Sequence, residues 1–179
     1  PESSRYITPW ARSTEPGLNG QGFKFDLTQW DPAYFTRLKA FMTAAAQSGI
    51  VVEFTFFCTL YDAPVWSASP MNAENNINGI GNCPPAEVLT LAHDDLTAVQ
   101  VAVTRKLVQE LKDFDNVIYE VCNEPYEGAL ASLPWQHRIV DTIVEEERTL
   151  GVKHLISMNI ANKQARVDAP HPDVQVLNF

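Results

Sequence analysis

Cysteine is scarce in this chain, and its few copies do not form a metal-binding pattern. The 179 residues include three cysteines, Cys58, Cys83 and Cys122, with no C-x-x-C pair among them. Zinc knuckles use paired cysteines at short spacings, and disulfide frameworks use even numbers of cysteines. We therefore expect no metal, no cofactor and no disulfide framework.

Long apolar runs, positive charge and several catalytic motifs are also missing. No apolar run approaches the roughly 20 residues that span a bilayer, and the net charge is −9. The lack of such a run leads us to expect no membrane as a partner. An acidic surface repels the phosphate backbone, so we also expect no nucleic acid as a partner. The chain also lacks a G-x-S-x-G elbow, a Walker loop and a strand-linked G-x-G-x-x-G fingerprint, which argues against serine-hydrolase, P-loop and dinucleotide-binding proteins.

What is present is the pattern of a globular domain in which helices and strands alternate. Hydrophobic residues make up 45% of the chain, which suits one domain over residues 1–179. After an irregular stretch over residues 1–30, periodicity and capping residues predict the elements in turn. They are a helix over 31–49, a strand over 50–60, a long loop over 61–93, a helix through Val99 and Leu111, a strand over 116–122, a helix over 133–151, and strands over 154–160 and 173–179. We expect the strand over 50–60 to be buried on both faces and residues 145–148 of the third helix to be solvated.

Strands separated by helices predict an α/β fold with a parallel sheet. Four strands form either a small open sheet or one half of an eight-stranded β/α barrel, which typically needs about 250 residues. Polar residues cluster after the strands, over 61–82, at 123–124 and over 159–162. Because a barrel keeps its site at the carboxyl ends of its strands, this clustering favours a partial (β/α)8 TIM barrel.

The most informative segment is the strand that ends in Asn123-Glu124-Pro125. Side chains repeat every two residues along a strand, so Glu120, Cys122 and Glu124 should share a face, with Glu124 at the reachable end. A rigidly held carboxyl group suits general acid/base catalysis, and the bland alternative is a capping or ion-paired rim residue. Glu120 and Glu53 lie deeper and are interpreted as buried acids paired with arginines or hydrogen-bond donors.

Several other side chains are candidates for binding a hydroxyl-rich ligand. Aromatic rings can stack on a sugar face, although a lone tryptophan is as often a core residue. Amides can donate to and accept from hydroxyls, although asparagine also serves turns. The predicted substrate-binding residues are Trp10, Tyr61, Trp66, Asn72, Asn76, Tyr126 and Asn159.

The strand over residues 117–125, ending in Asn123-Glu124-Pro125, resembles the fourth barrel strand of clan A glycoside hydrolases, the retaining cellulase- and mannanase-like (β/α)8 enzymes. Residues 49–62, 154–160 and 174–179 are similar to the third, fifth and sixth strands. The resemblance implies that Glu124 is the acid/base and that Asn123 hydrogen-bonds the sugar 2-hydroxyl and the nucleophile. It also implies a nucleophilic glutamate on a seventh strand, which this chain does not contain.

The leading hypothesis is therefore a fragment of a glycoside hydrolase that acts on β-linked polysaccharide or oligosaccharide. The chain starts at Pro1 and ends in a strand pattern, and we interpret both ends as truncations. Half a barrel leaves two sheet edges open, so we expect the chain to need a second fragment or a second copy. The alternatives are a non-catalytic carbohydrate-binding or assembly half barrel and an unrelated small α/β protein. The resemblance also favours a secreted or periplasmic location.

Overall fold

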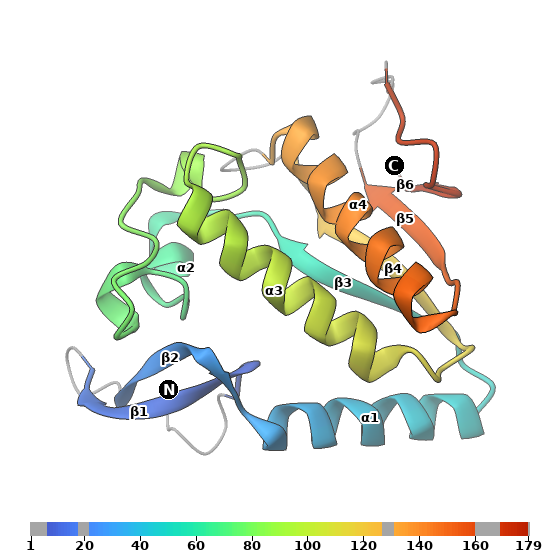
Figure 1. The fold of residues 1–179 in the computed structure, drawn as a ribbon, viewed down its shortest axis with the longest axis horizontal. Helices are drawn as coiled ribbons and strands as arrows, with labels where there is room; N and C mark the ends of the chain where they lie inside the picture. The colour runs from blue at the N-terminus through green and yellow to red at the C-terminus, as the bar shows by residue number, and fades with distance from the viewer. Residues whose placement is uncertain (1–6, 18–21, 127–130, 160–168, 179) are drawn as a thin grey trace.

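The computed structural model describes residues 7–17, 22–126, 131–159 and 169–178 (Figure 1). Its main sheet has four parallel strands in the order β3-β4-β5-β6. This arrangement confirms the predicted α/β fold with a four-stranded parallel sheet and flanking helices. The strands are β3 Val52–Cys58, β4 Val117–Asn123, β5 Leu155–Asn159 and β6 Val176–Asn178.

The sequence suggested an irregular stretch over residues 1–30, but the described residues 7–17 and 22–30 are not irregular. They contain an antiparallel pair, β1 Trp10–Pro16 and β2 Phe23–Trp30. Phe25 and Leu27 are buried at alternate positions of β2, which is the period-two pattern of a strand with one covered face. The prolines and glycines around this pair hid that short pattern.

Three long helices flank the sheet: α1 Pro32–Gln47, α3 Asp94–Leu111 and α4 Leu133–Leu150. Their ends follow the predicted capping signals. The Asp31 carboxylate accepts from the Ala33 N–H at 2.9 Å, and Ser132 caps α4 through the Trp135 N–H at 3.4 Å. Gly151, with φ of 71°, ends α4 in the left-handed conformation that glycine adopts at little cost. No helix of the described residues is long and apolar enough to cross a bilayer.

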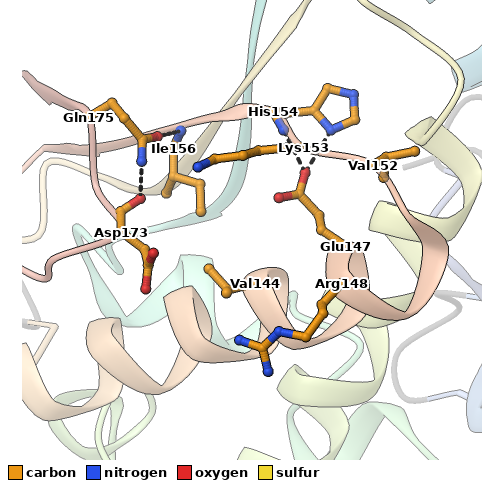
Figure 2. A pocket seen from close by; sticks show the side chains of 9 residues that line it. All are labelled: Val144, Glu147, Arg148, Val152, Lys153, His154, Ile156, Asp173 and Gln175. Atoms are coloured by element: carbon orange, nitrogen blue, oxygen red, sulfur yellow. Dashed lines mark hydrogen bonds and ion pairs between the residues drawn. The ribbon is translucent and has the colours of Figure 1, made fainter.

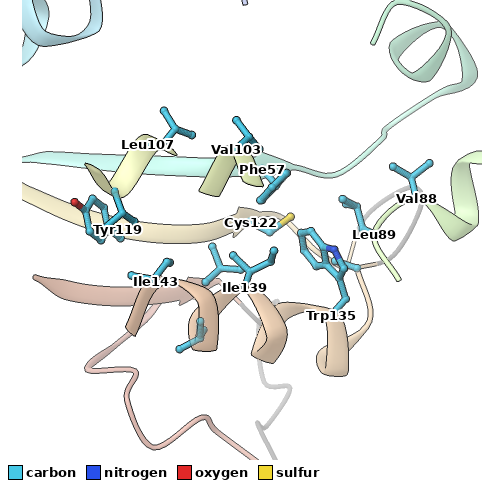
Figure 3. Packing of buried hydrophobic residues seen from close by; sticks show 14 of the residues in the cluster. Phe57, Val88, Leu89, Val103, Leu107, Tyr119, Cys122, Trp135, Ile139 and Ile143 are labelled. Atoms are coloured by element: carbon cyan, nitrogen blue, oxygen red, sulfur yellow. The ribbon is translucent and has the colours of Figure 1, made fainter. Parts of the chain in front are cut away.

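The core lies between the helices and the sheet, with α3 and α4 side by side (Figures 1 and 3). Trp135 at the start of α4 is fully buried and meets Phe57 of β3 edge-on, with ring centroids 5.1 Å apart. Its indole N–H donates to the Gln100 side chain on α3 at 2.8 Å. This packing fixes the carboxyl ends of β3 and β4 against both helices.

Two sequence-based expectations about burial are wrong. In β3 only Phe57 is buried, and Glu53 is exposed, because β3 has a strand neighbour on one side only in the described sheet. An apolar run alone cannot distinguish an edge strand from a central one. In α4, Glu146 and Glu147 are buried rather than solvated: Glu146 accepts from Gln109 at 2.8 Å, and Glu147 binds His154 (Figure 2).

The long connection over residues 61–93 is built from short helical turns. It contains α2 Ala63–Ser67 and two single-turn helices, η2 Ala73–Asn75 and η3 Pro85–Glu87. The Ile77 N–H donates to the Phe25 carbonyl of β2 at 2.9 Å. The connection and the β1-β2 pair therefore support each other beside the sheet.

Candidate active site

Polar residues stand at the carboxyl ends of all four strands of the sheet. Cys58 at the end of β3 lies in register with Asn123 at the end of β4. Asn159 at the end of β5 lies in register with Asn178 at the end of β6. The parallel arrangement brings these residues to one edge, as the sequence predicted.

The hydroxyl group of Tyr61 is the centre of a cluster at this edge. It donates to Oε2 of Glu124 and accepts from Nδ2 of Asn123 at 3.0 Å. The thiol of Cys58 donates to the Tyr61 hydroxyl oxygen at 3.7 Å. A phenol hydroxyl has one proton and two lone pairs, so these contacts use all of its hydrogen-bonding capacity.

Glu124 does not share a face with Glu120 and Cys122, contrary to the prediction from strand alternation. β4 ends at Asn123, and Glu124 follows in the left-handed region with φ of 45°. This conformation is uncommon for a residue with a Cβ atom. It breaks the alternation, so the side chains of Asn123 and Glu124 both reach the Tyr61 hydroxyl. Strained backbone of this kind concentrates at functional sites.

The carboxylate of Glu124 raises the pKa of Tyr61. The hydrogen bond to Glu124 is the main cause, followed by burial and by the nearby Cys58. A tyrosinate beside a carboxylate would bring two negative charges together, so the protonated phenol is favoured. Tyr61 therefore remains a hydrogen-bond donor to Glu124, while 47% of the residue stays exposed.

Glu120 lies inside the sheet and takes no direct part in this cluster. It is 3% exposed and accepts from Thr55 Oγ1 at 2.5 Å and from Asn178 Nδ2 at 3.4 Å. The prediction of a buried acid with hydrogen-bond donors is confirmed, although its partners in the described residues include no arginine. Glu53 is exposed, so the prediction that it is a buried acid is wrong.

The two tryptophans proposed for sugar stacking are packed inside the protein. Trp66 is 4% exposed and its indole N–H donates to the Cys83 carbonyl at 3.1 Å. Trp10 is 5% exposed and stacks on Trp30 with ring centroids 6.4 Å apart. Both rings are core residues, which corrects their assignment to substrate binding.

The predicted amides of the long connection hold the backbone of the connection itself. Asn76 is 2% exposed, and Asn72 accepts from the Glu74 N–H at 3.0 Å as the cap of η2. Asn76 therefore has no free polar atom to offer a ligand, which corrects its assignment. Its side chain donates to the carbonyls of Pro70, Asn72 and Ile80 and accepts from the N–H groups of Asn78 and Ile80.

The other two predicted binding residues lie at or near the carboxyl edge. Tyr126 is half-buried in the turn that follows Glu124 and Pro125. Asn159 is 6% exposed, and its buried Oδ1 has no hydrogen-bond partner among the described residues.

The sequence analysis did not predict the Tyr61 hydroxyl as the hydrogen-bond partner of Glu124. The signal was the position of Tyr61 three residues past the end of β3, the strand next to β4.

The described parts of the chain hold no group of three or more histidine, cysteine, aspartate or glutamate side chains placed to bind a metal ion. The functional groups at the candidate site are a carboxylate, a phenol, an amide and a thiol.

Comparisons of the chain with family models, with curated proteins and with solved structures gave no match.

Proposed function

We propose that this chain is part of a glycoside hydrolase that cleaves β-linked polysaccharide or oligosaccharide, with Glu124 as the general acid/base. The observation that carries the proposal is the Glu124 carboxylate at the carboxyl edge of a parallel sheet, oriented by Tyr61 and adjacent to Asn123. General acid/base groups need a fixed position within hydrogen-bond reach of the reacting atom.

In the proposed reaction, protonated Glu124 gives its proton to the glycosidic oxygen. The bond between that oxygen and the anomeric carbon breaks, its electron pair stays on the oxygen, and the leaving sugar departs as an alcohol. The anomeric carbon forms a bond to a second carboxylate, which another segment supplies. Glu124 then accepts a proton from water as the water oxygen bonds to the anomeric carbon and the bond to the second carboxylate breaks, which releases the second sugar and restores protonated Glu124 and the free second carboxylate. The Asn123 amide is placed to bind a sugar hydroxyl beside this centre.

We also propose that the four strands form half of an eight-stranded barrel. Three features support this. The strands follow one another in chain order across the sheet, whereas doubly wound sheets reverse their order. The helices α3 and α4 pack side by side on one face (Figure 1). Polar side chains from β3, β4 and β6 meet around Glu120 within the sheet.

The reactivity of Cys58 tests whether carbohydrate binds at this site. Cys58 is exposed and contacts both Tyr61 and Asn123, whereas Cys122 is buried and unreactive. In a Cys83→Ser variant, the rate of reaction with a water-soluble thiol reagent reports on Cys58. We expect a β-linked gluco- or manno-oligosaccharide to slow the reaction, and an α-linked glucan of equal length to have no effect. An unchanged rate with every β-linked sugar would contradict the proposal.

Turnover distinguishes the enzyme from a non-catalytic binding module. The assay uses the whole proposed hydrolase, that is, this chain together with the segment that supplies the second carboxylate; we call it the protein that supplies both carboxylates. In that protein, hydrolysis of an aryl β-glycoside should be lost in Glu124→Ala. Protection of Cys58 without turnover in that protein would favour the binding module.

A further inference from the structure

The hydrogen bonds around Tyr61 distinguish the two oxygens of the Glu124 carboxylate. Oε2 accepts from the Tyr61 hydroxyl. Oε1 has no hydrogen-bond partner among the described residues. The two oxygens of a free carboxylate are chemically equivalent, so this difference comes entirely from the position of Tyr61.

Tyr61 is held where it can make this distinction. The Thr59 N–H donates to the Asn123 carbonyl at 3.2 Å, which continues the pairing of β3 and β4 past Cys58. Asn123 also donates its side-chain amide to the Tyr61 hydroxyl at 3.0 Å. With its lone pairs occupied by Asn123 and Cys58, the hydroxyl can donate its one proton only to Glu124.

Donation from Tyr61 has a direct consequence for protonation. An oxygen that accepts a hydrogen bond from a neutral phenol is a poor place for the carboxyl proton, because the hydroxyl oxygen of a carboxylic acid is a weaker acceptor than its carbonyl oxygen. When Glu124 is protonated, the proton therefore belongs on Oε1. The left-handed backbone at Glu124 supports the same orientation, since it turns the side chain towards Tyr61.

We propose that Tyr61 is a positioning residue that holds Oε2 of Glu124 and leaves Oε1 as the oxygen that gives and receives the reactive proton. This inference rests on the proposed function, because it assumes that Glu124 is the acid/base. It gives the Tyr61 hydroxyl a role in addition to the sugar stacking that the sequence suggested for the Tyr61 ring. The exposed ring of Tyr61 can still contact a ligand, but its hydroxyl group serves Glu124.

A spectroscopic experiment on the chain tests the contact without turnover. The ring carbon Cζ of tyrosine, isotopically labelled, reports by NMR on the hydrogen bond of its hydroxyl, and Tyr61→Phe assigns the Tyr61 signal. We expect this signal to shift as the pH is lowered far enough to protonate carboxylates, and we expect no such shift in Glu124→Gln. The signal of Tyr34, which lies on α1, serves as the control. A Tyr61 signal that behaves alike in the wild type and in Glu124→Gln would overturn the inference.

A kinetic experiment tests the positioning role in the protein that supplies both carboxylates. We expect Tyr61→Phe to lower kcat by on the order of 100-fold, because a misplaced catalytic group loses most of its effectiveness. KM should change little, since the ring remains, and Tyr34→Phe should leave both constants unchanged. If Glu124→Gln is inactive while Tyr61→Phe matches Tyr34→Phe, the inference about Tyr61 is overturned and the proposed function stands. If Glu124→Gln keeps full activity, the proposed function itself fails.

Discussion

Oε1 of Glu147 accepts two hydrogen bonds from His154, one from its backbone N–H at 2.9 Å and one from ring Nδ1 at 2.7 Å. The other ring nitrogen, Nε2, lies 3.0 Å from the Phe114 carbonyl. Both ring nitrogens face acceptors, so the geometry suits the doubly protonated, positively charged ring. The pair lies beside a small pocket at the amino end of β5, away from the candidate site (Figure 2).

The first prediction concerns the pH dependence of stability. The hydrogen bond to Glu147 raises the pKa of His154 above its ordinary value of 6.5. A group whose pKa is higher in the folded state stabilises the protein fully below its unfolded pKa, and this contribution is lost as the pH rises through the folded pKa. We therefore expect the free energy of unfolding, measured with urea, to fall as the pH rises above about 6.5. In His154→Gln this part of the dependence should disappear.

His93 provides a matched control, because its ring also lies 2.7 Å from a glutamate, Glu87. The side chains of His93 and Glu87 are 32% and 47% exposed, against 7% and 5% for His154 and Glu147, and more exposed ion pairs contribute less. We expect His93→Gln to keep the wild-type pH dependence. An equal loss in both variants would contradict the role assigned to His154.

The second prediction concerns the buried Glu120. Thr55→Val removes the hydroxyl that donates to this carboxylate at 2.5 Å while keeping the shape of the side chain. Loss of a donor to a buried charged group costs about 1–3 kcal/mol. We expect a decrease of this size in the free energy of unfolding, and a smaller one in Thr55→Ser, which keeps the hydroxyl. A Thr55→Val protein as stable as the wild type would show that the contact does not form.

The third prediction compares two asparagines in the connection over residues 61–93. Aspartate at position 76 cannot donate, so Asn76→Asp loses three hydrogen bonds and buries a charge. We expect a loss of about 3 kcal/mol or more in the free energy of unfolding. Asn72→Asp keeps the acceptor that caps η2 and should lie within about 0.5 kcal/mol of the wild type. Equal stability of the two variants would contradict the described loop.

The fourth prediction concerns association. Apolar side chains near the amino end of the sheet are open to solvent, with Ile50 54%, Val51 63% and Leu155 48% exposed. β3 and β6 each pair with one strand in the described sheet, and unpaired edges promote association. We expect light scattering after size-exclusion chromatography to show the isolated chain as an oligomer. A strict monomer at every concentration would count against the half barrel.

The helices and the parallel sheet were predictable because their signals are local. Asp31-Pro32 and Gly151 mark helix ends through capping and backbone conformation, and Val103, Leu107 and Leu111 recur at helical spacing and are buried in α3. The exposure of β3 was not predictable, because burial depends on which strands lie beside it. The buried Glu147 was also missed, since its partner His154 belongs to the next segment of the chain.

At the candidate site, the sequence singled out Glu124 but not Tyr61 as its hydrogen-bond partner. Asn123-Glu124-Pro125 marked the end of a strand, and the structure places the Glu124 carboxylate at the carboxyl edge of the sheet beside Asn123. The left-handed φ of Glu124 has no signal in the local sequence. The contact with Tyr61 depends on the register of β3 and β4, and the position of Tyr61 just past the end of β3 was its one indication. Trp66 and Asn76 have residue types suited to sugar binding, yet internal partners occupy their polar groups.

The most direct test is the rate at which a β-linked oligosaccharide is hydrolysed by the protein that supplies both carboxylates, with Glu124 changed to glutamine. Glutamine keeps the size of the side chain and cannot transfer the proton, so we predict a loss of about 100- to 10,000-fold in kcat. Glu74→Gln, the same substitution at an exposed residue, is the control and should hydrolyse the substrate at the wild-type rate. Hydrolysis by Glu124→Gln at the wild-type rate would contradict the account.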